Sequence, residues 1–359
     1  MIVDWSSAEN HLLLNPRLPA EERVRLEELV AAAPPLVGHV FIATSGTSGS
    51  MKLVALAKDA ILASAAGVNR HLGATAADTW CCVLPTFHVG GLGIHARAHL
   101  SGARVVSMAW DAREFAAICA RERVALSALV PAQVHDLVSA NLRAPQSLRA
   151  IVVGGAAFPP ELYLGARALG WPVLPSYGMT ECCSQAATAL GDSPEMILLP
   201  HLQARTNEEG RLAFRGSSLF TGNCLFDDRG DATFVDPKID GWFVTEDLGE
   251  VEGGVLRVSG RRGEFVKIGG ESVDLRRLDA ILEAIARDHG VDAAVFAVDD
   301  ARLGHVIHLA VAGEPEPVRR AFDAWVLPFE RARAVHRVDA IPRSPLGKLL
   351  RRRLEEQLE

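Results

Sequence analysis

The stretch "FIATSGTSGSMKLVAL", residues 41–56, joins an apolar run to a loop of hydroxyls and glycines that ends at Lys52. The apolar residues 40–43 predict a buried strand. In the loop, Gly46 and Gly49 allow close approach of the backbone to a ligand, and successive N–H groups form an anion-binding nest. The Walker pattern GxxxxGK[ST] is absent. The stretch alone leaves two interpretations open, a phosphate cradle and an ordinary Ser/Gly turn.

Strand-like and helix-like segments alternate on both sides of this loop. We expect helices over 17–33 and 58–72 and a strand over 38–43. Further strand-like runs, separated by helix-like stretches such as 111–123 and 131–143, lie at 80–84, 103–108, 126–130, 150–153 and 172–175. This alternation predicts parallel α/β layers. Short strands with Gly and Asp turns over 210–260 predict an antiparallel or barrel-like subdomain.

The last hundred residues predict a separate small domain. We expect helices at 275–288 and 316–326 and strands at 293–298, 305–312 and 334–338. The segment "SGRRGEF", residues 259–265, is the candidate hinge. The predicted fold is therefore α/β: a large N-terminal α/β domain with layered sheets and a small β-rich subdomain (1–260), followed by a small α+β C-terminal domain (261–359).

Composition narrows the class of protein. The chain has 359 residues, 49% of them hydrophobic, and a formal net charge of -7, so nucleic acid and anionic membrane are poor default partners. It has no apolar run of transmembrane length and no signal-peptide h-region. Its six cysteines show no CxxC spacing, which argues against a zinc site. We expect a reducing, cytoplasmic location.

Other polar motifs follow apolar runs further along the chain. "SYGMTEC" (176–182) carries Thr180 and Glu181, an oxygen ligand of the kind that Mg²⁺ prefers. "IVVGGAAFP" (151–159) ends in a glycine pair, "DGWFVTEDLGE" contains Asp247, and "IPRSPLGKLL" contains Lys348. Taken singly, each is more commonly a structural or solvated residue than a functional one.

The order of these motifs is more specific than any one of them. A hydroxyl-rich loop, YGMTE, Asp247, GR…K…GG and PRSPLGK together resemble the adenylate-forming superfamily of acyl- and aryl-CoA ligases, from Phe41 to Leu354. The resemblance implies two half-reactions. A carboxylic acid and ATP form an acyl-adenylate and pyrophosphate, and a thiol, usually that of coenzyme A, then displaces AMP. It also implies a mobile C-terminal domain and bound Mg²⁺.

The resemblance assigns roles to particular residues. Lys348 meets the carboxylate and the α-phosphate, Glu181 places Mg²⁺, Thr180 bonds the α-phosphate, and His88 edges the acid pocket. The β- and γ-phosphates are assigned to Thr44, Ser45, Gly46, Thr47, Ser48, Gly49 and Lys52. The rest of the nucleotide is assigned to Gly155, Ala156, Tyr177, Gly178, Asp247, Arg261 and Lys267. Of these, Gly155, Ala156 and Tyr177 frame the adenine, and Asp247 and Arg261 fix the ribose.

Within the superfamily, "SYGMTECCSQ", "LPTFHVGGLGI" and "PRSPLGKLLRRRL" are similar to the o-succinylbenzoate–CoA ligases of menaquinone biosynthesis. That resemblance implies an acid with two carboxylates. His95 and Arg97 are candidates to meet the second carboxylate, or they lie on a solvated helix face. Two other functions stay open: a ligase for another aryl or acyl acid or for a carrier protein, and a nucleotide-binding homologue without turnover.

Several positions depart from the superfamily pattern. Met51 and Leu53 flank the loop lysine where proline and glycine are usual, and Gly263 stands at the hinge. Glu246 replaces the glycine before Asp247, which is unfavourable near a nucleotide unless the carboxylate points away. About forty residues precede the loop, fewer than is usual. We expect layers beside the acid pocket to be missing or supplied by a second copy in a homodimer.

Overall fold

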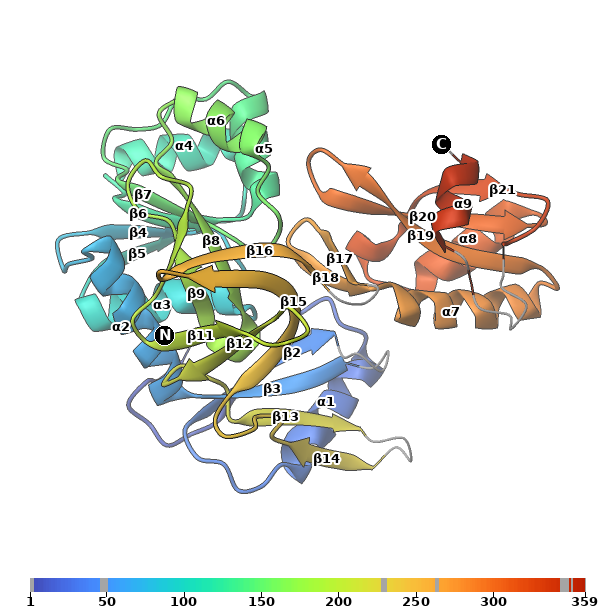
Figure 1. The fold of residues 1–359 in the computed structure, drawn as a ribbon, viewed down its shortest axis with the longest axis horizontal. Coiled ribbons are helices and arrows are strands. Elements are labelled where there is room, and N and C mark those ends of the chain that lie inside the picture. The colour runs from blue at the N-terminus through green and yellow to red at the C-terminus, as the bar shows by residue number, and fades with distance from the viewer. Residues whose placement is uncertain are drawn as a thin grey trace. The chain divides into compact units, whose positions relative to one another are not determined.

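The structure is a computed structural model that describes residues 3–45, 51–226, 231–261, 265–342, 349 and 351–358. The chain forms two compact units: in this part of the described residues the first unit ends at Arg261 and the second begins at Phe265. Figure 1 shows both units, each with its own sheets and helices. Each unit is described by itself below.

A mixed sheet in the first unit carries the start of the hydroxyl-rich loop. Its strands, in order across the sheet, are β1 (His11–Leu13), β2 (His39–Ser45), β3 (Met51–Ala57), β13 (Gly222–Phe226) and β14 (Ala232–Val235). Helix α1 (Ala20–Ala32) packs against β3, β13 and β14. Strand β3 was not expected from the sequence, and it places Lys52 in a strand rather than in the loop.

A second, larger sheet is continuous across the first unit. Its strands, in order, are β11 (Leu202–Thr206), β12 (Arg211–Gly216), β15 (Phe243–Glu252), β16 (Val255–Arg261), β10 (Met196–Leu198), β9 (Ser184–Thr188), β8 (Val173–Met179), β7 (Ala150–Val153), β6 (Leu126–Leu129), β4 (Thr79–Cys82) and β5 (Arg104–Ser107). Strands β8, β7, β6, β4 and β5 are parallel, as the α/β alternation predicts. The strands from β11 to β9 are antiparallel, and they extend this sheet instead of closing a barrel.

Helices cover both faces of the parallel strands (Figure 1). Helices α2 (Lys58–Leu72) and α3 (Val89–Ser101) contribute to one core, which contains Trp80 and Cys82 of β4. Helices α4 (Ala112–Arg121), α5 (Pro131–Ser139) and α6 (Pro160–Ala168) enclose the other core, which contains Cys81 and Val83. Successive side chains of a strand point to opposite faces, and all four residues of β4 are buried because helices cover both faces.

The second unit is a small α+β layer structure. Its sheet has the order β18 (Glu271–Asp274), β17 (Phe265–Ile268), β20 (Gly304–Ala312) and β19 (Asp292–Asp300), and β21 (Ala332–Arg337) pairs with β20. Helices α7 (Leu275–Asp288) and α8 (Pro315–Trp325) supply Leu278, Leu282 and Phe322 to one core. Leu354 of α9 (Arg351–Leu358) packs with Phe296 in a separate cluster. The elements predicted for this region are found within one to two residues of the expected positions.

Two further features bear on the class of protein. Across the described residues, none of the helices is both long and apolar enough to cross a membrane. All six cysteines are buried free thiols.

Candidate functional site

An ion pair joins two of the residues that the motifs single out. Lys52, on β3, and Glu181, on the 3₁₀ turn η1 (Thr180–Cys182), lie 3.0 Å apart between Nζ and Oε1. Their side chains are 22% and 16% exposed, so solvent reaches the pair but screens it only in part. The cation expected at the phosphates and the carboxylate expected at the metal are therefore in one place, although 129 positions separate them in sequence.

A second contact brings together the residues expected at the adenosine. Tyr177 Oη donates a 2.7 Å hydrogen bond to Asp247 Oδ2, and the Tyr177 ring stacks on Phe214. The backbone N–H of Asp247 donates to the buried hydroxyl of Thr245, which fixes the carboxylate's place on β15. Asp247 and Arg261 are directly opposite in the β15–β16 ladder. The two residues expected at the ribose thus sit side by side on adjacent strands.

The turn between β8 and β9 links these two contacts. Cys182 is fully buried there, which raises the pKa of its thiol well above the ordinary value, and the nearby carboxylates of Glu181 and Asp247 raise it further. Cys183 and Ser184 have φ of 56° and 121°, in the left-handed region that side chains rarely adopt. Such strain persists only where the surroundings hold it, and it gathers at functional sites.

Gly178 shows how tightly this turn is folded. A Cβ built on Gly178 would lie 1.8 Å from the carbonyl oxygen of Ser184, so only glycine fits. The strand β8 continues through Met179, which places Tyr177 and Gly178 inside the strand and not in a corner after it. The YG pair of the motif is therefore explained by a stacked ring followed by a close backbone approach.

The start of the hydroxyl-rich loop offers an unused polar atom. Among the described residues, the hydroxyl oxygen of Thr44 is buried and has no hydrogen-bond partner. A buried hydroxyl without a partner costs free energy, which a phosphate oxygen bound there would recover. Ser45 ends β2, and Gly46, Thr47, Ser48 and Gly49 lie outside the described residues.

Other expected nucleotide residues lie at the carboxyl ends of parallel strands. Gly155 (φ 87°) and Ala156 follow β7, and Thr180 follows β8. His88 precedes α3 in the loop after β4, where its ring packs on Phe87 with centroids 4.6 Å apart. In open α/β sheets, ligands bind outside the carboxyl ends of the strands. The placement of these residues fits that rule.

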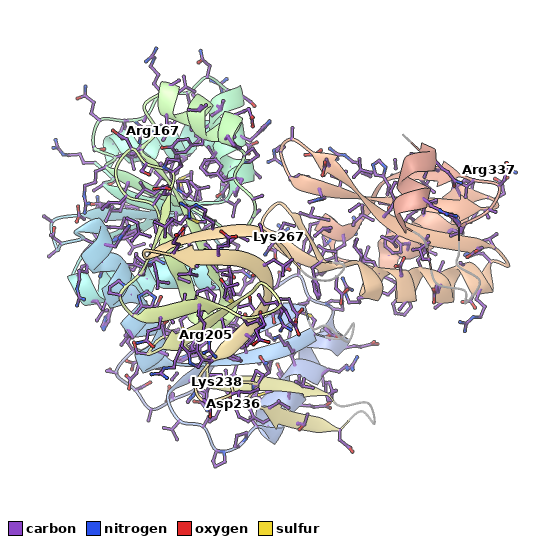
Figure 2. All side chains as sticks on the ribbon, in the orientation of Figure 1. Arg167, Arg205, Asp236, Lys238, Lys267 and Arg337 are labelled. Atoms are coloured by element: carbon purple, nitrogen blue, oxygen red, sulfur yellow. The ribbon has the colours of Figure 1, made fainter. Side chains whose placement is uncertain are left out.

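Two predicted residues belong to the second unit. Lys267 lies on β17 opposite Ser272, and its carbonyl accepts a hydrogen bond from His305 Nδ1 (Figure 2). Lys348 lies outside the described residues, as does Gly263 of the candidate hinge. Their roles stay predictions.

The buried guanidinium of Arg97 was not expected. The alternative of a solvated helix face is wrong, because Arg97 is only 1% exposed. Its Nη2 donates to Ser184 Oγ at 3.1 Å, its Cζ lies 5.7 Å from the Trp80 ring centroid, and burial lowers its pKa to about 10. Among the described residues Arg97 pairs with no carboxylate, and its Nε has no acceptor. A buried positive charge in that state is suited to an anionic ligand.

His95 is also partly enclosed rather than solvated. Burial lowers the pKa of its imidazole, and its Nε2 has no partner among the described residues. Arg97 is hydrogen-bonded to Ser184, whereas among the described residues His95 is not, so the structure separates the two candidates for a second carboxylate.

Glu246, the departure that raised doubt about Asp247, is neutralised. Its Oε1 lies 3.1 Å from Nη2 of Arg211, whose Nε donates to the carbonyl of Thr245. The Glu246 carboxylate is thus held by a guanidinium, whereas the Asp247 carboxylate accepts a hydrogen bond from Tyr177. The extra carboxylate therefore does not oppose nucleotide binding.

Lys238 supports the site in a way that no motif indicates (Figure 2). Its Nζ donates to the carbonyls of Phe220 and Thr221 and pairs with Asp236. The N–H of Phe220 in turn donates to the carbonyl of Glu181 at 2.9 Å. Sequence reasoning missed this support because it depends on segments that are neighbours only in the fold.

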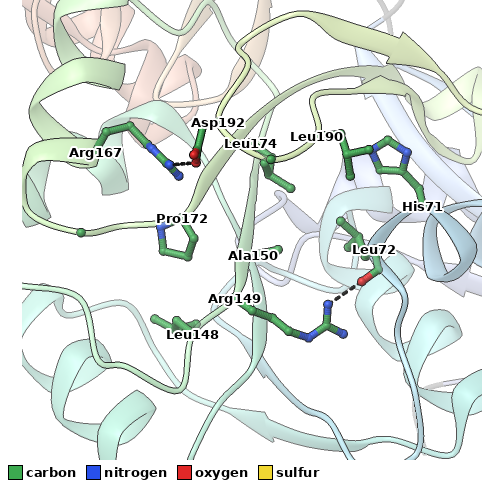
Figure 3. Close-up of a pocket in the computed structure, with 12 residues that line it drawn as sticks. His71, Leu72, Leu148, Arg149, Ala150, Arg167, Pro172, Leu174, Leu190 and Asp192 are labelled. Carbon is green, nitrogen blue, oxygen red and sulfur yellow. Dashed lines mark hydrogen bonds and ion pairs between the residues drawn. The ribbon is translucent and has the colours of Figure 1, made fainter.

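A pocket of about 390 Å³ lies at the opposite, amino ends of β7 and β8 (Figure 3). Its arginines are already engaged: Arg167 pairs with Asp192, and Arg149 binds Asp78 and the carbonyls of Leu72 and Gly73. None of the expected site residues lines this pocket. We therefore place the candidate site at the carboxyl ends.

Mg²⁺ fits the residues at the carboxyl ends. Among the described residues, no three His, Cys, Asp or Glu side chains gather around one point. Magnesium does not need such a cage, because it is commonly held by one or two carboxylates together with substrate phosphates and water. Glu181, beside Lys52, offers one carboxylate to such a site, and its role as a metal ligand stays a prediction.

Comparison with known proteins agrees with this geometry. Residues 20–222 match the family described as AMP-binding enzymes. The 2-succinylbenzoate–CoA ligase of Bacillus licheniformis is 30% identical over 332 residues, which are 87% of this chain and 68% of that protein. The corresponding ligase of Staphylococcus aureus is 28% identical over 330 residues, covering 87% of this chain and 65% of that protein.

Solved structures point to the same fold. A double mutant of o-succinylbenzoate CoA synthetase (MenE) from Bacillus subtilis, bound to the product analogue OSB-NCoA, superposes with a TM-score of 0.78 at 25% identity, covering 88% of this chain and 69% of that one. The MenE complex with ATP and a magnesium ion gives a TM-score of 0.57 at 26% identity, over 88% and 69% of the two chains. The superfamily resemblance and the α/β fold are thus confirmed. The family match spans more than half of the sequence, and the chain belongs to the AMP-binding enzyme family.

Proposed function

We propose that the chain is an ATP-dependent acid–CoA ligase whose acid is 2-succinylbenzoate. The relatives reported above carry that activity in their names, at 28–30% identity over most of this chain. In the first half-reaction, a carboxylate oxygen bonds to the α-phosphorus of ATP and the bond to pyrophosphate breaks. In the second, the thiol of coenzyme A bonds to the acyl carbon, loses its proton, and AMP leaves.

The observation that carries this proposal is that two polar contacts lie together, one near the end of β8 and the other on the turn that follows it. Lys52–Glu181 supplies a cation and a metal ligand for the phosphates, and Tyr177–Asp247 supplies an aromatic ring and an acceptor for adenosine. Tyr177 and Glu181 are separated by only three residues across the end of β8, so the two contacts belong to one site. A site that held only a phosphate would have no use for the second contact.

Charge neutralisation is what the first half-reaction requires. A carboxylate is repelled by an anionic triphosphate, and positioning with electrostatic stabilisation provides most of the catalysis in phosphoryl-type transfer. Mg²⁺ held at Glu181 would offset negative charge on the phosphates. When the nucleotide is bound, Lys52 would exchange its carboxylate partner for phosphate oxygens, and Thr44 would donate its hydroxyl proton to one of them.

Arg97 supports an acid with two carboxylates. One carboxylate of 2-succinylbenzoate is activated, and the other must be taken out of water next to a cation. The Arg97 guanidinium is buried, lacks a carboxylate partner among the described residues and has Ser184 beside it. An aromatic acid with a single carboxylate would leave the Arg97 guanidinium without an ionic partner.

Four parts of the account stay predictions. They are the contact of Lys348 with the carboxylate and α-phosphate, the rotation of the C-terminal domain about 259–265, a homodimer that completes the acid pocket, and a cytoplasmic location. Such a rotation of the C-terminal domain would bring Lys348 to the nucleotide. Light scattering that shows an active monomer would remove the homodimer.

The test is acid-dependent pyrophosphate release. The reaction with 2-succinylbenzoate should require ATP, Mg²⁺ and the acid together, should yield a coenzyme A thioester by mass spectrometry, and should nearly vanish in K348A. Benzoates and fatty acids that react while 2-succinylbenzoate is inert would move the proposal to another acid. ATP binding by calorimetry without adenylate from any acid would support the nucleotide-binding homologue instead.

A further inference from the structure

His201 lies in the turn between β10 and β11, with its ring largely enclosed. Its Nε2 is 2.9 Å from the carbonyl oxygen of Gln185. A carbonyl only accepts hydrogen bonds, so Nε2 carries the proton of the neutral ring and Nδ1 carries the lone pair. Burial, together with a smaller contribution from the charge of Arg97, lowers the pKa of His201 to about 4. The ring is therefore a fixed neutral donor at physiological pH.

The carbonyl that His201 binds follows the most strained backbone of the site. Gln185 comes directly after Cys183 and Ser184, which have φ of 56° and 121°. Strained backbone keeps its conformation only when its surroundings over-determine it. Ser184 is also the residue whose Oγ receives the Nη2 donor of Arg97. The hydrogen bond from His201 thus fixes the chain one residue away from the partner of the buried guanidinium.

Helix α2 holds the other side of the ring. A Cβ built on Gly67 would lie 2.0 Å from Nδ1 of His201 and 2.9 Å from Cε1. Gly67 is buried within α2, where any larger residue would displace the ring. The imidazole is therefore wedged between the helix and the carbonyl of Gln185. It has no freedom to turn without moving one of them.

The backbone of His201 anchors a second segment of the site. Its carbonyl accepts the N–H of Ser217 at 3.2 Å, and Phe220 of the same segment donates to the carbonyl of Glu181. His201 therefore contacts chain on both sides of the turn that carries Glu181 and Ser184. The bond to Ser217 is made by the backbone, so a substitution of the His201 side chain leaves it in place and removes only the bond to Gln185.

We propose that His201 is a positioning residue for the acid pocket: through the Gln185 carbonyl it sets Ser184, and through Ser184 it sets the guanidinium of Arg97. It thereby sets the preference for acids that carry a second carboxylate. This inference rests on the proposed function, because the second carboxylate belongs to the proposed substrate. His201 itself does not touch the reacting atoms.

His71 provides a matched control. Its Nε2 makes the same kind of bond, 3.0 Å long, to the carbonyl of Ala189, just beyond the far end of β9. Ala189 is four positions from Gln185, and among the described residues no hydrogen bond joins it to Ser184 or Arg97. H71L and H201L remove equivalent hydrogen bonds from the two ends of one strand. Only the second should affect the acid.

The experiment compares two acids across five proteins. Pyrophosphate release is measured for 2-succinylbenzoate and for 3-benzoylpropionate, the same molecule without its ring carboxylate, in wild type, H201L, H201Q, G67A and H71L. In H201L we expect KM for 2-succinylbenzoate to rise about tenfold, the effect of losing one hydrogen bond, while KM for ATP and for 3-benzoylpropionate stays within twofold. H201Q keeps an N–H at the position of Nε2 and should stay within about threefold of wild type.

G67A keeps the His201 donor but displaces the ring, and it should reproduce the selective rise in KM. Thermal unfolding shows whether H201L is folded. If it is not, G67A takes its place in the test. The proposal is overturned if H201L or G67A changes KM for both acids equally or for neither, or if H71L shows the same selectivity. Wild type without activity on 2-succinylbenzoate counts against the proposed function, whereas wild-type activity with unselective variants counts only against His201.

Discussion

Replacing Arg97 with Met separates stability from substrate binding. Burial lowers the pKa of Arg97 from 12.5 to about 10, which at 1.36 kcal/mol per pKa unit corresponds to about 3 kcal/mol of unfavourable free energy for the charged form. The contacts that offset it are the Ser184 hydrogen bond, about 1 kcal/mol, and the interaction with the Trp80 ring, about 2 kcal/mol. These terms nearly cancel. We therefore expect the free energy of unfolding of R97M to lie within about 1 kcal/mol of that of the wild type.

The effect on the proposed substrate should be much larger. A buried charge that loses its partner costs about 2–5 kcal/mol, so kcat/KM for 2-succinylbenzoate should fall at least about thirtyfold in R97M. The activity on 3-benzoylpropionate should change little, because that acid has no carboxylate for Arg97 to meet. Pyrophosphate release measures both acids, and urea unfolding measures stability.

Arg149 is the control for this prediction. It binds both oxygens of Asp78 and the carbonyls of Leu72 and Gly73, so R149M should lower the free energy of unfolding by about 2 kcal/mol and leave both KM values unchanged. R97M with an unchanged kcat/KM for 2-succinylbenzoate would refute the role of Arg97 in binding the acid. So would an equal loss of activity on both acids.

Three further predictions address the strained turn and its surroundings. E181Q removes the carboxylate at the phosphate end of the site, and pyrophosphate release at saturating Mg²⁺ should fall about hundredfold. G178A places a Cβ 1.8 Å from the Ser184 carbonyl and should lower the free energy of unfolding by about 2 kcal/mol in urea titrations. His201 has a pKa of about 4 when folded and 6.5 when unfolded, so the unfolded chain binds its proton first as the pH falls. Stability should therefore decline between pH 6.5 and 4, by up to about 3 kcal/mol from this group, and less steeply in H201Q.

Each of these has an outcome that contradicts it. E181Q within threefold of wild type would mean that Glu181 does not serve the metal. G178A with wild-type stability would mean that the close approach to Ser184 relaxes freely. Identical pH dependence of unfolding in wild type and H201Q would mean that His201 is not held neutral in the fold.

The α/β layers followed from local pattern. Apolar strands such as β7 alternate with amphipathic helices such as α4, and each pattern is written in consecutive residues. The second unit was predictable for the same reason, and α7 begins and ends where its periodicity does. The motif order was enough for the family, which the match over residues 20–222 confirms.

The contacts between motifs could not be read from the sequence. Lys52 and Glu181 are 129 positions apart, and β3, which carries Lys52, follows the glycines so closely that it does not stand out as a strand. Arg97 lies on helix α3, and charged residues on a helix are usually solvated. Its burial depends on Trp80 of β4 and Ser184 of β9, which are neighbours of Arg97 only in the fold. Likewise, only the three-dimensional pairing shows that the antiparallel strands continue the parallel sheet.

The most direct test of the account is to detect the acyl-adenylate itself. The wild-type protein is mixed with ATP, Mg²⁺ and 2-succinylbenzoate without coenzyme A, quenched, and analysed by mass spectrometry alongside E181Q and K348A. We predict an adenylate of the acid in amounts equal to the pyrophosphate released by wild type, and almost none from either variant. ATP that stays intact in the presence of a full panel of acids, although the protein binds it, would contradict the central claim that this site activates a carboxylate.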